Sequence, residues 1–266
     1  MQISIHHRLS LELGAGINRA VQHLLLTPQT GPTQTVHEWR IDMPGIDEAA
    51  GFLDGFGNRA HLASQSKPDP ELRIAVSGVV ETHDTNGVIG RLEREPVPTL
   101  FRRVTPLTRP IGAIVGRFRN AKMESRIALL HALMERTAEV LGAPEQAQTQ
   151  AQDMQQQQQA TGAVPGAADY AHAFIGAARA LDIPARYVTG YFSGEDGRPA
   201  AFHAWAEAWD ESLGWICFDA MLSLCPTVRH VRIATGLDAV SAMPVRSYPA
   251  IGLPQHLTMD VEATAQ

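Results

Sequence analysis

The clearest hydrophobic pattern in the chain lies between residues 164 and 220. Apolar side chains recur there at three- and four-residue steps, which predicts an amphipathic helix. They are Ala171, Phe174, Ile175, Ala178 and Leu181. Pro165 and Gly166 precede this helix, and Pro184 ends it because the residue before a proline is pushed out of the helical region. The β-branched and aromatic run 186–192 then predicts a strand, and 203–209 with 214–219 predicts a hairpin.

Residues 1–105 show a different pattern, typical of a β-domain. Residues 3–9 alternate between apolar and polar positions, as a half-buried strand does. Further short strands are predicted at 21–26, 36–43, 51–62 and 72–81, separated by Gly, Pro, Asn and Asp clusters. This spacing favours a sandwich or a barrel. Residues 54–58 (DGFGN) read as a tight turn in which glycine supplies positive φ.

The remaining segments are less regular. A proline-punctuated connector covers 97–110, where Thr108 or Arg109 is expected to cap the next helix. A helix is predicted at 125–141, with a buried stripe of Ile127, Leu130, Leu133, Met134 and Val140. The glutamine-rich run 149–160 is predicted to form a polar surface helix. After a strand at 229–234, the tail is expected to finish a strand near Leu257 and then fray.

Composition narrows the class of protein. Of 266 residues, 44% are hydrophobic and 19% charged, as in ordinary soluble globular proteins. The 28 acidic and 22 basic residues give a net charge of −6, which argues against nucleic acid as a partner. No basic start is followed by an apolar run, so neither a signal peptide nor a membrane span is expected. Two cysteines make no disulfide framework, and we expect a cytoplasmic protein.

Two residues in the hairpin have the chemistry of a catalytic base and its orienting group. His203 opens one strand and Asp219 ends its neighbour, so pairing of the strands would bring imidazole and carboxylate together. The matching nucleophile belongs at the start of the preceding helix, where the macrodipole stabilises a thiolate. The residues there are Gly166, Ala167 and Ala168, and none of them can attack a substrate.

Four ordered segments carry a resemblance to a known family. They are DYAH at 169–172, IPARYVTGY at 183–191, HAWAE at 203–207 and GWICFD at 214–219. This order resembles the core of bacterial transglutaminase-like proteins, which have a papain-like fold and the pattern G-x-C-x-D-[FYH]-A-H before the later motifs. The resemblance implies that Ala167 occupies the position of the catalytic cysteine, that His203 is the base and that Asp219 orients it.

The resemblance also implies a domain organisation. Residues 1–105 resemble the N-terminal β domain that accompanies this core in bacteria, through the opening strand, residues 54–58 and residues 79–82. We therefore predict an α+β protein: an N-terminal β-sandwich at 1–105, a papain-like core of a helix packed on an antiparallel sheet at 106–250, and a tail at 251–266. Five positions near the site depart from the family pattern: Pro165, Ala220, Met221, Leu237 and Ala239.

Five further residues are candidates for ligand contact or for support of the site. Asp169 and His172 lie three apart on one helix face, where a packing pair is as good an interpretation as substrate contact. Arg186 and Tyr187 lie on the strand beside the site, and either structural support or ligand binding fits them. Trp205 is two residues beyond His203.

Other chemistries find little support. Cys217 lies mid-strand near a carboxylate, which would raise its thiol pKa, so it is interpreted as a buried apolar residue rather than a replacement nucleophile. Cys225 follows in a loop, where the path of the chain leaves its role open. The eleven histidines show no H-x-x-x-H pattern, and we expect neither a metal nor a cofactor.

Three functions remain open. The first is a pseudoenzyme that kept the base and its orienter, lost the cysteine and binds a peptide- or amide-type ligand or a protein partner. The second is a cysteine amidase, peptidase or acyltransferase in which alanine was introduced at position 167. The third is a scaffolding partner in a larger assembly. The resemblance weakly implies ATP-grasp-type ligases or proteasome-like proteins as partners, and the oligomeric state stays open.

Overall fold

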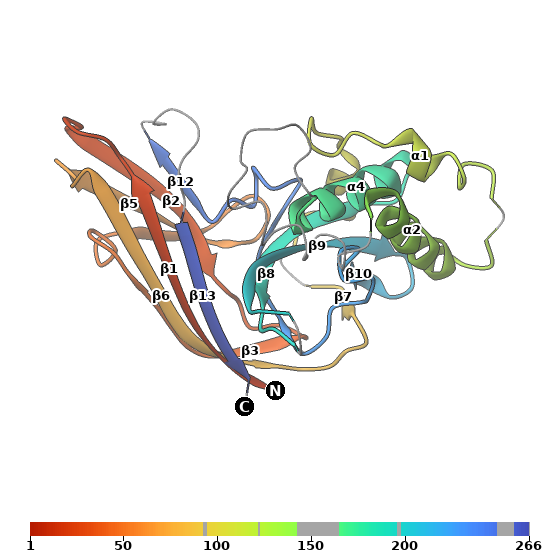
Figure 1. Ribbon diagram of the computed structural model, residues 1–266, viewed down its shortest axis with the longest axis horizontal. Helices are drawn as coiled ribbons and strands as arrows, with labels where there is room; N and C mark the ends of the chain where they lie inside the picture. Colours follow the sequence, from red (N-terminus) through yellow and green to blue (C-terminus); the bar gives the residue numbers. More distant parts are fainter. Residues whose placement is uncertain (93–94, 122, 143–164, 196–197, 249–257, 266) are drawn as a thin grey trace.

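The computed structural model describes residues 1–266 apart from 93–94, 122, 143–164, 196–197, 249–257 and 266. The chain is a strand-rich α+β protein with antiparallel sheets, as predicted. A β-sandwich forms one side of the molecule, and a sheet covered by helices forms the other (Figure 1). The predicted helix at 149–160 falls outside the described residues. None of the described helices is long and apolar enough to cross a membrane.

Two four-stranded sheets form the sandwich, in the orders β13-β1-β6-β3 and β12-β2-β5-β4. The strands are β1 (Gln2–Glu12), β2 (Arg19–Thr27), β3 (Gln34–Asp42), β4 (Ala50–Leu53), β5 (Arg59–Ser66), β6 (Glu71–Thr82), β12 (Val245–Tyr248) and β13 (Thr258–Ala265). Inward residues of both sheets share one apolar core, for example Leu9 and Ile74 of one sheet with Leu24 and Ala63 of the other. The alternation of apolar and polar residues along these strands therefore predicts correctly which side chains are buried.

Two predictions for the sandwich region were wrong in detail. The tail does not fray after Leu257: β13 pairs with β1 from Ile3↔Ala265 to Ser10↔Thr258, so the two ends of the chain lie together (Figure 1). The pairing gives β1 a partner on its open side, and a lone strand pattern does not reveal such a distant partner. The single strand predicted at 51–62 is two strands, β4 and β5, separated by the predicted turn. The domain boundaries stay predictions.

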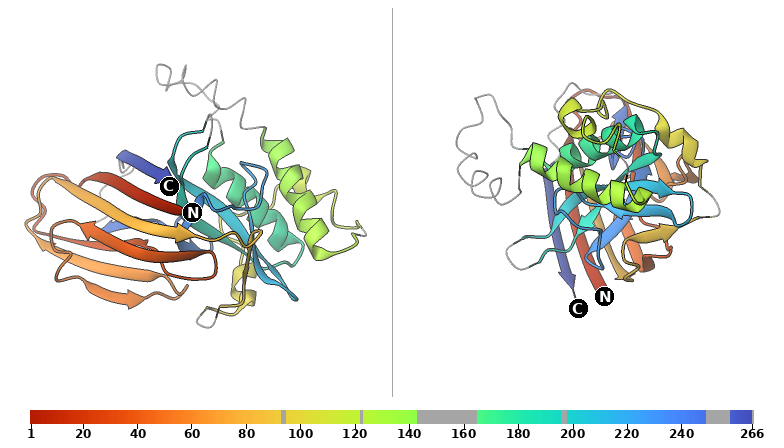
Figure 2. Two further views of the ribbon diagram at one scale, coloured as in Figure 1. Left: turned by 90° about the horizontal axis from the view of Figure 1, so that it is seen from below. Right: turned by 90° about the vertical axis from the view of Figure 1, so that its right-hand side faces the viewer.

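A five-stranded antiparallel sheet in the order β11-β8-β9-β10-β7 forms the core. Its strands are β7 (Val88–Gly90), β8 (Ala185–Phe192), β9 (Ala201–Asp210), β10 (Gly214–Phe218) and β11 (His230–Gly236). The helical elements are η1 (Pro98–Arg102), α1 (Gly112–Val115), α2 (Arg126–Leu141) and α4 (Ala167–Ala180). Helices α2 and α4 pack together beside the sheet (Figures 1 and 2).

The two faces of β9 have different partners. Ala204, Ala206 and Ala208 share an apolar cluster with α4, because small side chains let the helix approach the sheet closely. Trp205 and Trp209 point the other way and join a second cluster with Trp215 and Cys217. His203 has the parity of Trp205, so its side chain leaves the strand on the face turned away from these alanines.

Capping explains where the helices begin. Ser125 precedes α2, and its hydroxyl accepts the N–H of Ala128 at 3.1 Å. The expected capping of the helix after the connector by Thr108 or Arg109 was wrong, because α1 begins after Ile111 without a side-chain cap. Thr108 instead accepts a hydrogen bond from the buried Arg179 at 2.8 Å. The Arg179 guanidinium carries several N–H donors that need acceptors, and the Thr108 hydroxyl is one of the connector groups that supply them.

Candidate functional site

Ala167 is the first residue of α4. Gly166 is the N-cap, and its N–H donates to the carboxylate of Asp169 at 2.9 Å, which anchors the first turn. Ala167 is half-buried and packs against the apolar cluster under the helix. The position therefore has the helix N-terminus that would stabilise an anionic sulfur, but its methyl group offers no nucleophilic atom.

His203 and Asp219 meet as the strand pairing predicted. Nε2 of His203 lies 2.5 Å from Oδ2 of Asp219, and both side chains are buried. The last β9–β10 pair is Ala206↔Phe218, so these two groups lie just beyond the point where β10 ends. Burial alone would raise the pKa of Asp219, but the charge and hydrogen bond of His203 and the hydrogen bond of His230 hold that pKa well below its usual range. The carboxylate is therefore ionised, as an orienting group must be.

His230 is a third member of this cluster that sequence reasoning missed. It begins β11, and its Nε2 lies 3.2 Å from the same Oδ2 of Asp219. Trp205, 2% exposed, packs edge-on against the His230 ring with the centroids 5.4 Å apart. One ligand atom from each of His203, Asp219 and His230 lies within 4.8 Å of the others, so these are the residues that could hold a divalent cation. The expectation of no metal stays a prediction.

Asp169, His172 and Tyr187 form a separate group on the α4 side of the sheet. The His172 ring stacks on Tyr187 at 4.9 Å, and its Nε2 accepts the N–H of Ala239 at 3.0 Å. Burial lowers the pKa of His172, with Asp238 and Asp169 opposing. The packing interpretation therefore describes His172 well, since its ring joins α4, β8 and the loop after β11.

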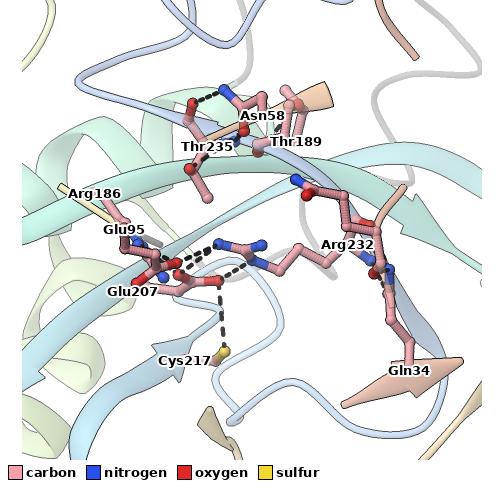
Figure 3. A network of polar contacts seen from close by, with 11 residues as sticks. Gln34, Asn58, Glu95, Arg186, Thr189, Glu207, Cys217, Arg232 and Thr235 are labelled. Carbon is pink, nitrogen blue, oxygen red and sulfur yellow. Dashed lines mark hydrogen bonds and ion pairs between the residues drawn. The ribbon is translucent and has the colours of Figure 1, made fainter. Parts of the chain in front are cut away.

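Arg186 belongs to a buried charge network rather than to an open site (Figure 3). Its Nε donates to Glu207 at 2.5 Å and its Nη1 pairs with Glu95 at 2.8 Å. Nε of Arg232 donates to the Glu207 carboxylate at 2.8 Å. Burial alone would raise the pKa of Glu207, but the two arginines lower it below its usual range. The Arg186 guanidinium also lies 4.0 Å from the Trp215 ring centroid, so its role in this structure is support.

Only part of this network reaches a cavity. A cavity of about 340 Å³ between the sandwich and the core is lined by Glu95 and Arg232, together with residues of the 29–34 loop. Arg186 is not among its lining residues and is fully buried. The sequence allowed two interpretations for Arg186, and the structure favours structural support over ligand contact.

Two amide side chains of the sandwich clamp β11, the edge strand of the core sheet (Figure 3). Gln34 receives the Arg232 N–H and donates to the Arg232 carbonyl, each at 2.8 Å. Asn58 binds Thr235 in the same way: it accepts the Thr235 N–H at 2.8 Å and donates to the Thr235 carbonyl at 2.7 Å. Each amide thus pairs with β11 as a neighbouring strand would. The sandwich thereby holds the strand that carries His230.

The cysteines are poor surrogate nucleophiles. Burial and the nearby Glu207 raise the pKa of the Cys217 thiol well above its usual range, and its sulfur lies 4.0 Å from the Glu207 carboxylate. The interpretation of Cys217 as a buried apolar residue is supported, although the carboxylate beside it is Glu207. Burial also raises the pKa of Cys225.

Two family models match parts of this chain. Residues 122–220 match the model of the transglutaminase-like superfamily, and residues 3–81 match the bacterial transglutaminase-like N-terminal region. Residues 122–220 are therefore similar to a transglutaminase-like core. Both matches agree with the resemblance predicted from the motifs, and the core match contains Ala167, His203 and Asp219.

One solved structure shares this fold. The crystal structure of "a Putative Cysteine Protease" from Cytophaga hutchinsonii superposes with a TM-score of 0.65 at 20% identity, covering 99% of this chain and 90% of that one. The protein ML0607 of Mycobacterium leprae (strain TN), named as uncharacterized, is 24% identical over 244 residues, 83% of each chain. The periplasmic domain of TgpA from Pseudomonas aeruginosa reaches a TM-score of only 0.24 at 15% identity, over 83% of this chain and 90% of that one, so no argument rests on it.

Proposed function

We propose that this chain is a transglutaminase-like pseudoenzyme that binds a peptide- or amide-type ligand, or a protein partner, without forming a covalent bond to it. The observation that carries the proposal is the retained His203–Asp219 pair, 2.5 Å apart, in a chain with alanine at the first residue of α4. A base without a nucleophile can accept a hydrogen bond from a ligand but has nothing to activate. Cytoplasmic localisation and the partner classes stay predictions.

The departures from the family pattern support natural loss of the cysteine over a single introduced alanine. Ala220 is 2% exposed and belongs to the core packed under α4. Met221 and Ala239 pack against the same core, and Leu237 packs against the cluster that contains Trp205 and Trp215. These residues are integrated into the packing around the site, as expected when a whole neighbourhood has changed together.

Restoring the nucleophile tests the proposal. In Ala167→Cys the helix N-terminus favours the thiolate, so the new thiol should have a pKa below the free value of about 8.5. It should react with iodoacetamide faster than Cys217. His203 leaves β9 on the face turned away from α4, and we propose that its ring still reaches the new sulfur, so that His203→Ala should remove part of the advantage. We expect no amide turnover, because the surrounding positions have changed. The pH dependence of alkylation, read by mass spectrometry with Ala167→Ser as the control, measures the effect.

Two results would contradict the proposal. Amide hydrolysis by Ala167→Cys would mean that the site is a complete cysteine hydrolase with alanine in place of its nucleophile. Stoichiometric labelling of the unaltered chain at Cys217 or Cys225 by a thiol-reactive peptide amide, if lost in His203→Ala, would make that cysteine a surrogate nucleophile.

A further inference from the structure

Asp219 accepts hydrogen bonds from three groups, whereas a base–orienter pair requires one. Oδ1 receives the Leu222 N–H at 3.0 Å, and Oδ2 faces Nε2 of both His203 and His230. The carboxyl is buried, and its pKa lies well below the usual range because the imidazoles outweigh the effect of burial. An ionised carboxylate has no proton to give, so each imidazole must be the donor in its own bond.

Thr227 makes the assignment for His230 independent of that argument. The Thr227 N–H donates to Nδ1 of His230 at 3.1 Å, and the His230 N–H returns a bond to the Thr227 carbonyl at 3.0 Å. A backbone N–H always carries its proton, so Nδ1 must hold the lone pair. The proton of the neutral ring then sits on Nε2, pointing at Asp219. A cation bound at Nε2 of His230 would have to displace that proton while Thr227 blocks the other nitrogen.

His203 follows from the same reasoning. Its Nε2 donates to Asp219, so the lone pair of the neutral ring is on Nδ1. Within the part of the chain that the structure describes, no hydrogen bond reaches this Nδ1. The hydrogen bonds that connect Thr227, His230, Asp219 and His203 therefore end at Nδ1 of His203, an acceptor that no donor of the described residues reaches.

We propose that His230 is a positioning residue that holds Asp219 through the same Oδ2 that faces His203, and that the group bound at His203 is a hydrogen-bond donor such as an amide N–H. The ligand assignment rests on the proposed function, whereas the polarity of the imidazoles does not. An ester or a bare carbonyl offers His203 only a second acceptor, which its Nδ1 cannot satisfy.

Long-range ¹H–¹⁵N correlation spectra of the ¹⁵N-labelled full chain at pH 8 test the polarity, with His203→Gln and His230→Gln supplying the assignments. Both rings should show the Nε2–H tautomer. An Nδ1–H tautomer at either ring would overturn the inference. N-methylacetamide should then shift the His203 Nδ1 resonance more than methyl acetate, which has the same carbonyl acceptor but no N–H. No shift with the amide, or equal shifts with both, would overturn the ligand assignment while leaving the polarity standing.

Two substitutions of His230 in the Ala167→Cys background test positioning. His230→Gln can still accept from Thr227 and donate to Asp219, whereas His230→Phe keeps an aromatic ring but loses both bonds. Alkylation of the introduced thiol should slow roughly tenfold in His230→Phe, the usual effect of losing a hydrogen bond to a charged group, and recover in His230→Gln. Equal rates in the two variants, with urea unfolding showing both folded, would refute positioning. An unactivated thiol even with His230 intact, alongside the expected tautomers, would instead count against the proposed function alone.

Discussion

The amide clamp between the sandwich and β11 gives the sharpest stability prediction. Gln34 is 3% exposed and makes three hydrogen bonds of 2.8–2.9 Å: two to the backbone of Arg232 and one to the carbonyl of Gln29. In Gln34→Ala the Arg232 N–H and carbonyl lose their partners. Each unsatisfied group costs about 1–3 kcal/mol when it stays buried, and less where water can reach it. We therefore expect a loss of about 2–4 kcal/mol in the free energy of unfolding.

The chain contains a matched control for this substitution. Gln22 is also buried, but among the described residues its side chain makes one long hydrogen bond, 3.4 Å to Ser247, and its Oε1 has no partner there. Gln22→Ala removes a similar side-chain volume without breaking the clamp. Urea unfolding at 25 °C should separate the two variants by about 2 kcal/mol, and thermal unfolding by roughly 4–8 °C. Equal destabilisation by both substitutions would refute the idea that Gln34 acts as a strand substitute for β11.

Three further predictions concern buried charges. Arg179→Lys should cost about 3 kcal/mol in urea unfolding, because one ammonium cannot serve the several carbonyls that the guanidinium binds. Glu207→Gln should cost about 3–5 kcal/mol since it leaves two arginines undercompensated, whereas Arg73→Ala, which breaks an exposed pair, should leave the urea midpoint nearly unchanged in the same assay. Because the pKa of Asp219 is depressed in the folded state, its ionised form stabilises the fold above the ordinary aspartate value of about 4. The cost of Asp219→Asn should therefore be complete at pH 7 and shrink in unfolding curves recorded as the pH falls below about 4.

Local patterns were sufficient to predict the core around the site. Apolar spacing predicted α4, which runs from Ala167 to Ala180, and β-branched runs predicted β8, β9 and β10 close to their observed bounds. The hairpin predicted that His203 and Asp219 would lie near each other, but their contact depends on more than the register, because the last pair is Ala206↔Phe218 and Asp219 lies beyond it. The helix and these strands depend on residues close together in the sequence, so local patterns are enough to predict them.

What the sequence could not predict depends on distant partners. His230 joins Asp219 only because β11 pairs with β8, at the far side of the sheet from β10. Glu95 comes from the segment between β7 and η1 and Gln34 from the sandwich, and neither lies in a motif. A polar residue with such a role looks like any surface residue until the fold supplies its partner. The pairing of β13 with β1 was hidden in the same way, since it joins the two ends of the chain.

The motif residues themselves divide between fold and chemistry. Arg186 and Glu207 are direct cross-strand partners of β8 and β9, and Trp215 covers the guanidinium of that pair. Their retention is explained by the cost of leaving a buried charge unpaired, whatever the site does. The match of IPAR, HAWAE and GWICFD to an enzyme family therefore speaks mostly for the fold. Among the motif residues, His203, Asp219 and Ala167 are the ones that bear on the proposed chemistry: the first two form a buried pair at 2.5 Å, and the third offers no nucleophilic atom at the start of α4.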